Sequence, residues 1–155
     1  MAEQPDLDIR HLAKGYEFPS FHVALDPAGV RRYLEAVEDA SEVYYPDASA
    51  SAQESLPALA PPLGAVVLVL KALLERLKLP EAAVHTAQEL EFRRALAADA
   101  HLACRARVAQ RSELRGAVIS VIEFEIAEEG GGPAPAVVGR TTIMAAQASP
   151  GGSQP

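Results

Sequence analysis

The hydrophobic and polar positions predict two kinds of element in the first half of the chain. Residues 21–25, "FHVAL", place apolar side chains at every second position, which is typical of a strand, and turn His22 to the opposite face. Residues 26–39 then follow a helical period. Asp26 is a suitable N-cap and Pro27 suits the first helical position. The apolar stripe of this helix comprises Val30, Tyr33, Leu34 and Val37.

A long loop and a second helix come next. Residues 46–62, "PDASASAQESLPALAPP", are rich in small polar residues and prolines, which indicates a surface loop. A loop of this length inside a domain is often a lid or a binding loop. Residues 63–79 predict a helix that Pro80 stops. Because its N-terminal half is apolar all round, we expect this helix to be buried on most sides.

The second half of the chain predicts strands joined by turns. The strands are expected at residues 83–92, 101–110, 116–127 and 136–145. The turns "SELRG" (112–116) and "EEGGGPAP" (128–135) contain residues that tolerate tight backbone. Two of these strands have a clear inner face, made of Leu102, Cys104, Ala106 and Val108 in the first and of Val118, Ser120, Ile122, Phe124 and Ile126 in the second. Arg105 and Arg107 then point outward.

This order of elements predicts an α+β fold, with an antiparallel sheet that needs a helix on one face. A long central helix wrapped by such a sheet describes the hot-dog fold. We expect residues 1–7 to be a flexible lead-in, residues 8–146 to form a single domain, and residues 147–155 to be a disordered tail.

Composition and charge exclude several classes of function. The net charge of −7, with no cluster of Lys and Arg, argues against nucleic-acid binding. One cysteine, Cys104, excludes an internal disulfide and a cysteine-built zinc site. The polar N-terminus is no signal peptide, and the longest apolar run, residues 63–70, is too short to span a membrane. We therefore expect a cytoplasmic protein without membrane contact.

Three segments together resemble the MaoC-like dehydratases, and specifically their N-terminal-type hot-dog domain. They are "KGYEFPSFHVALDPAGVRRYLEAVEDASEVYY", "LAPPLGAVVLVL" and "VHTAQELEFRRALAADAHLACRARV". The resemblance covers roughly residues 8–146. Where the third segment usually ends in Gly-Asp, this chain has Asp99 and Ala100. Because Asp tolerates left-handed backbone better than most residues, Asp99 could still make the turn.

The resemblance implies a reaction and a site. Family members hydrate or dehydrate acyl thioesters on coenzyme A or an acyl carrier protein. Their active half carries Asp-x4-His within Gly-Asp-x-Asn-Pro-x-His. Here Asp39 matches the Asp, Tyr44 stands in the place of the His, and Glu38 replaces the Gly. Asp39 and Tyr44 are thus a degenerate dyad.

The chemistry of this pair is incomplete. A hydratase base should titrate near the working pH, as His does, whereas free Tyr titrates near 10. Residues five apart on a helix are about 140° apart, so Asp39 and Tyr44 converge only if the helix ends between them. Each also has a structural interpretation. The alternative for Asp39 is a solvated carboxylate near a helix C-terminus, and the alternative for Tyr44 and Tyr45 is packing under the long loop.

The resemblance also implies substrate-binding positions, which are Tyr45, Ala60, Pro61, Pro62, Leu63, Gly64, His85 and Gln88. His85 is more typical of a structural strand histidine than of a catalytic one. Cys104 is expected to fill the core. Arg105 and Arg107 indicate a solvated face or, alternatively, contacts to a coenzyme A phosphate. No spacing among the histidines indicates a metal site.

Three functions remain open. The first is a subunit of an (R)-specific enoyl-thioester hydratase or 3-hydroxyacyl-thioester dehydratase, which shapes the acyl pocket and needs a partner chain with Asp-x4-His. The second is a homodimeric acyl-thioester-binding module without chemistry. The third, a hot-dog thioesterase, is disfavoured because residues 63–74 contain no acidic residue. None needs a cofactor beyond the carrier of the substrate. For each of these three functions we expect a homodimer or a heterodimer, because the sheet has an edge strand that must be covered.

Overall fold

Five strands form one antiparallel sheet, and their order in space differs from their order in the chain. The computed structural model describes residues 7–45 and 58–147. The sheet order is β1-β5-β6-β7-β3. Its members are β1 (Phe21–Ala24), β5 (His101–Leu114), β6 (Ala117–Glu128), β7 (Val137–Ala146) and β3 (Val84–Phe92). The chain therefore crosses from one edge strand, β1, to the other, β3, before β5, β6 and β7 fill the middle.

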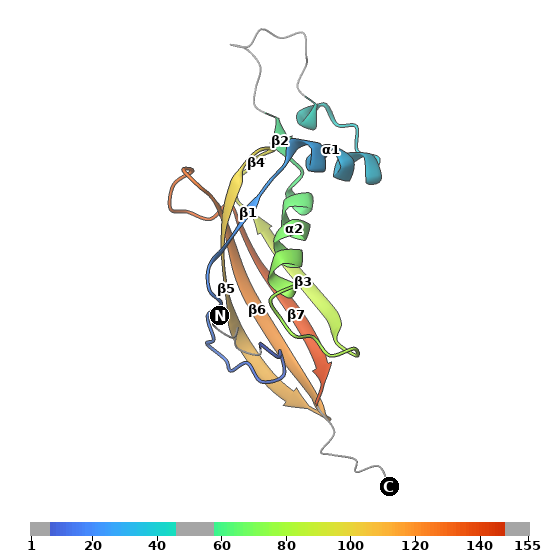
Figure 1. Cartoon of the computed structure of the whole chain (residues 1–155), viewed down its shortest axis with the longest axis vertical. Helices are drawn as coiled ribbons and strands as arrows, with labels where there is room; N and C mark the ends of the chain where they lie inside the picture. Colours follow the sequence, from blue (N-terminus) through green and yellow to red (C-terminus); the bar gives the residue numbers. More distant parts are fainter. Residues whose placement is uncertain (1–6, 46–57, 148–155) are drawn as a thin grey trace, which may run out of the picture.

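The helix α2 (Pro62–Leu74) lies along one face of this sheet, as Figure 1 shows. The remaining elements gather at one end of the sheet, which we call the overhang end. They are α1 (Pro27–Ala36), the 3-10 turn η1 (Glu42–Tyr44), β2 (Leu59–Ala60) and β4 (Leu96–Ala97). A sheet wrapped around a central helix confirms the hot-dog fold and the α+β class.

The face of the sheet toward α2 is apolar, as the alternation predicted. The expected inner residues of β5 and β6 are all buried, including Cys104 and Ser120. Gly139 of β7 pairs with Phe124 of β6 on this face. A Cβ atom on Gly139 would lie 2.2 Å from Cζ of Phe124, so the glycine makes room for the aromatic ring.

The helix α1 begins as predicted and ends early. The carboxylate of Asp26 accepts hydrogen bonds from the N–H groups of Ala28 and Gly29, and Pro27 is the first helical residue. Val30 and Leu34 are buried in the core. The prediction that Val37 completes the stripe is wrong, because Val37 is the C-cap and its side chain is exposed.

The central helix differs from the prediction in length and in burial. α2 ends at Leu74, not near residue 79, and the chain then turns through Arg76 and Leu77. Only one flank of α2 is buried. On that flank Val66, Val69 and Leu73 are 0% exposed, whereas Leu63, Val67 and Leu68 are 52%, 49% and 41% exposed.

Three smaller predictions need correction. The strand β5 continues to Leu114, so only Arg115 and Gly116 remain as the turn that was expected over residues 112–116. Residues 59–60, expected in the loop, pair with residues 96–97. Asp99 lies in a turn but not with left-handed backbone. Most of the long loop (46–57), most of the lead-in (1–6) and most of the tail (148–155) lie outside the described residues.

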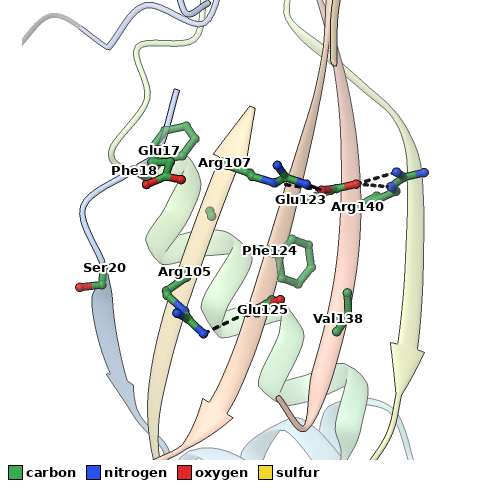
Figure 2. Close-up of a pocket in the computed structure, with 11 residues that line it drawn as sticks. Glu17, Phe18, Ser20, Arg105, Arg107, Glu123, Phe124, Glu125, Val138 and Arg140 are labelled. Atoms are coloured by element: carbon green, nitrogen blue, oxygen red, sulfur yellow. Dashed lines mark hydrogen bonds and ion pairs between the residues drawn. The ribbon is translucent and has the colours of Figure 1, made fainter. Parts of the chain in front are cut away.

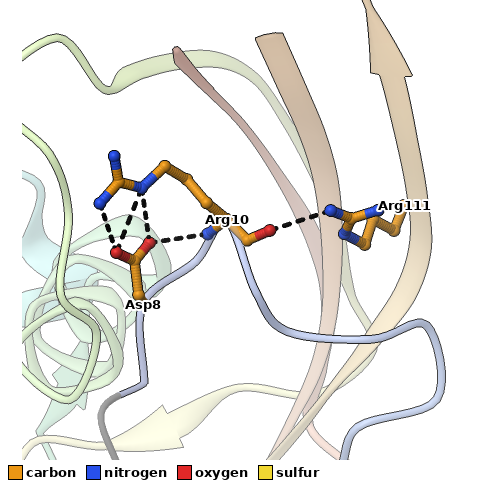
Figure 3. Close-up of polar contacts among 3 residues, drawn as sticks. All are labelled: Asp8, Arg10 and Arg111. Atoms are coloured by element: carbon orange, nitrogen blue, oxygen red, sulfur yellow. Dashed lines mark hydrogen bonds and ion pairs between the residues drawn. The ribbon is translucent and has the colours of Figure 1, made fainter. Parts of the chain in front are cut away.

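The N-terminal segment is anchored to both α2 and the sheet. Asp8 makes a bridge with Lys78, beyond the end of α2, and is almost fully buried. Its carboxylate accepts hydrogen bonds from the backbone N–H and the guanidinium of Arg10, and Arg111 of β5 donates to the Arg10 carbonyl oxygen at 2.9 Å (Figure 3). The hydrogen bonds from Arg10 lower the pKa of Asp8 to about 2, against the opposing effect of burial.

Candidate functional site

The overhang begins where α1 reverses direction. Glu38 has a φ of 55°, in the left-handed region, and its N–H donates to the Glu35 carbonyl oxygen at 3.2 Å. The N–H of Asp39 donates to the Leu34 carbonyl oxygen at 2.9 Å. This is the helix ending that glycine favours, because a residue with a Cβ is strained there. The chain keeps the turn with Glu38 in place of glycine, at a cost in strain.

Asp39 follows this turn, and its carboxylate is held locally. Oδ1 of Asp39 accepts a hydrogen bond from the N–H of Ser41 at 2.9 Å. Because α1 ends at Ala36, both Asp39 and Tyr44 lie outside the helix, which removes the geometric obstacle to a pair. Even so, no hydrogen bond between these two side chains is present in the described part of the chain.

Tyr44 belongs to η1 and points into a small cavity beside α1. The cavity has a volume of about 180 Å³. Its lining is mostly apolar and comprises Pro27, Val30, Arg31, Leu34, Tyr44, Tyr45, Ala58 and Ala98. Tyr44 also packs against the core. A phenol in this position can donate a hydrogen bond to a ligand, but no described neighbour is placed to make it a base.

The segment from Ala60 to Gly64 lies next to this cavity. Ala60 is buried in β2 opposite Leu96, Pro61 is the N-cap of α2, and Pro62 is its first residue. A Cβ atom on Gly64 would lie 3.0 Å from the Tyr33 ring and 3.1 Å from Pro61, so glycine allows Tyr33 to pack closely on the start of α2. No side chain caps this end of the helix.

His85 and Gln88 lie elsewhere. Both are on β3, and His85 pairs with Ile143. Nε2 of His85 is 2.9 Å from Oγ1 of the buried Thr141 and 2.9 Å from the Ala87 carbonyl oxygen. The amide of Gln88 donates to the Arg140 carbonyl oxygen at 2.9 Å. His85 precedes the end of β3 by seven residues, roughly 20 Å from the overhang end of the strand.

The predicted site residues are therefore split into two groups. Asp39, Tyr44, Tyr45 and residues 60–64 gather at the overhang end. The pair on β3 does not join them within this chain. Sequence reasoning missed Tyr33 and Arg31, which complete the overhang group. Arg31 directly follows Val30 of the apolar stripe, and that position at the margin of the stripe was the available signal.

The outward arginines lie on the face of the sheet away from α2. Arg107 and Arg140 both donate to the carboxylate of Glu123, at 2.7 and 2.6 Å, and Arg105 donates to Glu125 at 3.3 Å (Figure 2). The hydrogen bonds from Arg140 and then Arg107 lower the pKa of Glu123. These residues line a hollow of about 610 Å³ together with Glu17 and Ser20. Because each guanidinium already has a carboxylate, this face does not favour a phosphate.

Neither a reactive cysteine nor a metal site is found among the described residues. Cys104 is fully buried, and burial raises the pKa of its thiol to about 12, so it fills the core as predicted. In residues 7–45 and 58–147, no cluster of three or more His, Cys, Asp or Glu side chains has the geometry of a metal site. No helix in these residues is long and apolar enough to cross a membrane.

A family profile described as "FAS1-like, dehydratase domain region" matches residues 13–129, which is most of the chain. The chain belongs to the MaoC-like dehydratase family. No curated protein sequence is similar enough to count as a relative.

Solved structures of MaoC-like and (R)-hydratase proteins share the fold. The MaoC-like dehydratase from Rhodospirillum rubrum has a TM-score of 0.71 and 15% identity, over 92% of this chain and 99% of that chain. The (R)-hydratase from A. caviae involved in PHA biosynthesis has a TM-score of 0.67 and 18% identity, over 86% and 97%. The truncated HadBC (3R-hydroxyacyl-ACP dehydratase) complex from Mycobacterium tuberculosis has a TM-score of 0.63 and 18% identity, over 87% and 98%.

Within the MaoC-like dehydratase family, this chain has the overhang without the usual pair of groups on it. Glu38 takes the backbone conformation for which the family pattern has glycine. Tyr44, which the motif resemblance matches to the histidine, lines a mostly apolar cavity.

Proposed function

We propose that this chain is one subunit of a MaoC-like (R)-specific enoyl-thioester hydratase or 3-hydroxyacyl-thioester dehydratase, of the N-terminal, non-catalytic type. It shapes the acyl pocket, and a partner chain supplies Asp-x4-His. One observation carries this proposal. Tyr44 lines a mostly apolar cavity, while the carboxylate of Asp39 accepts a hydrogen bond from the N–H of Ser41. Neither group is arranged to move a proton between water and an acyl chain.

The partner has a surface to dock on. Leu63 and Val67 are exposed on the same flank of α2, and among the described residues β3 pairs with β7 alone, so its other edge is open there. An open strand edge and an exposed apolar helix flank both favour a second hot-dog domain that covers them. Two of the similar structures are complexes of two different chains, HadBC and ChsH1-ChsH2 from Mycobacterium tuberculosis, which supports a partner for this fold.

The substrate is an acyl thioester carried on coenzyme A or an acyl carrier protein. The start of α2 supports this part of the proposal, because its N-cap, Pro61, offers no side chain to accept from the first backbone N–H groups of the helix. Such donors suit a thioester carbonyl. In this proposal Tyr44, which lines the cavity beside α1, and Asp39 lie on the overhang side of the acyl site, and His85 and Gln88 contribute from β3. The subunit works in the cytoplasm and needs no further cofactor.

Co-expression with a hot-dog chain that carries Asp-x4-His, followed by native mass spectrometry, tests the proposal. We expect a 1:1 heterodimer. Val67→Asp on the exposed flank should reduce the heterodimer to monomers, whereas Leu114→Asp, an equally exposed position away from this flank, should not. A heterodimer that survives Val67→Asp contradicts the proposed surface.

The same open edge favours a second candidate, a homodimeric acyl-thioester-binding module without chemistry. In that case the chain alone gives a dimer by native mass spectrometry, and the co-expressed partner stays unbound. It then binds acyl-coenzyme A without turnover.

A further inference from the structure

Arg31 stands between two hollows on the surface of α1. On one side is the 180 Å³ cavity that Tyr44 and Tyr45 line. On the other is a hollow of about 420 Å³, lined by Pro27, Ala28, Arg31, Arg32 and Glu35. Pro27 and Arg31 border both hollows. A ligand that fills both would therefore contact the Arg31 side chain.

Arg31 is also chemically available. Its side chain makes no ion pair or hydrogen bond with any described residue, in contrast to the arginines of the sheet. Arg32 is only loosely held, because its Nη2 lies 4.0 Å from the Asp26 carboxylate, which caps α1. Glu35 is the one acidic residue on the larger hollow. Asp26 and Glu35 thus balance the charges of the two arginines, and Arg31 is the one of the two guanidinium groups that has no described carboxylate partner.

The two hollows differ in the chemistry that they accept. The smaller one offers apolar walls from α1 and the phenol groups of Tyr44 and Tyr45, neither of which has a described hydrogen-bond partner. Such a lining suits a neutral arm that has amides and methyl groups. The larger one offers two guanidinium groups, which bind phosphate well because they donate several hydrogen bonds in one plane.

We propose that Arg31, with Arg32 beside it, binds the phosphate of a phosphopantetheine arm whose neutral part lies along the Tyr44 and Tyr45 cavity. The inference rests on the proposed function and identifies where the carrier of the thioester enters. The phosphate of this arm is common to coenzyme A and acyl carrier proteins. Arg105 and Arg107, on the opposite face of the sheet, then have no part in carrier binding.

Calorimetric titration of the full chain with 4′-phosphopantetheine and with pantetheine tests this assignment. We expect the phosphorylated compound to bind about tenfold more tightly at low salt, and this preference to shrink as salt screens the charge. Arg31→Gln should remove the preference, because it weakens binding of the phosphorylated compound far more than binding of pantetheine. Arg115→Gln is the matched control, because Arg115 lies in the β5–β6 turn and also lacks a described partner.

Other outcomes contradict the inference in distinguishable ways. If both compounds bind and Arg31→Gln behaves like Arg115→Gln, the phosphate site is wrong and the proposed function stands. If Arg31→Gln weakens only coenzyme A and adenosine 3′,5′-bisphosphate, the arginine reads the nucleotide phosphates and the assignment to the arm is wrong. If the wild-type chain binds none of these compounds, the proposed function and the inference are both overturned.

Discussion

The two flanks of α2 are made of the same residue types and meet different surroundings. One flank packs on the inner face of the sheet, and its valines and leucine are inaccessible to solvent. The other presents Leu63, Val67 and Leu68, which are 52%, 49% and 41% exposed. The difference teaches that the apolar pattern of this helix exceeds what the described part of the chain buries, and under the proposed function a partner covers the rest.

The largest expected effect comes from placing the same charge on each flank. Val69→Asp buries an unpaired carboxylate and should cost about 4 kcal/mol or more, or prevent folding. Val67→Asp should change the free energy of unfolding by no more than about 0.5 kcal/mol, because the side chain stays in water. Urea unfolding of the isolated chain measures both. Equal losses at the two positions would break the comparison.

A second prediction concerns the sheet surface beneath the buried flank. Gly139→Ala places a Cβ against the Phe124 ring and should cost about 1 to 3 kcal/mol by overpacking. Phe124→Leu in the same chain should recover part of that loss, because the smaller side chain yields space. A double-mutant cycle measures the coupling. Additive effects would mean that the ring and Gly139 are not in contact.

A third prediction uses pH on the segment that ties α2 to the N-terminus. The folded pKa of Asp8 is about 2, below its usual 3.8, so ionised Asp8 stabilises the fold above pH 3.8. That contribution, on the order of 1 to 2 kcal/mol, is lost as the pH falls from about 4 toward 2. Asp8→Asn should remove this part of the pH dependence in unfolding experiments. An unchanged slope would show that Asp8 is not ionised in a stabilising contact.

The smallest effect is expected at the overhang, next to the exposed flank. Glu38→Gly should stabilise the chain by about 0.5 to 1 kcal/mol, because glycine adopts the left-handed conformation without strain. Glu35→Gly, inside α1, is the control and should destabilise by a similar amount. Thermal unfolding compares the two. Destabilisation by Glu38→Gly would mean that the turn carries no strain.

Local patterns predicted much of the fold. Alternation identified the inner residues of β5 and β6, and Asp26 with Pro27 located the start of α1. The predictions that failed concerned features that depend on contacts between residues far apart in the sequence. β2 forms only because β4 pairs with it, and the exposure of Leu63 and Val67 depends on a surface that this chain does not cover.

The sequence predicted which residues belong to the candidate site better than it predicted how their side chains are arranged. The comparison of motifs placed Asp39 and Tyr44 together, and the structure keeps both at the overhang. It could not show that Tyr44 and Arg31 line the same cavity, since that depends on how η1 and α1 are placed in the fold. His85 and Gln88 lie away from the overhang residues. The sequence could not predict this, because local residue spacing does not determine the order of strands in the sheet.

The most direct test of the central claim is the rate of crotonyl-coenzyme A hydration by the purified chain, with and without a hot-dog partner that carries Asp-x4-His. The account predicts no turnover by this chain alone and a rate for the mixture above that of the partner alone. Rapid hydration by this chain alone, abolished by Asp39→Asn, would contradict it.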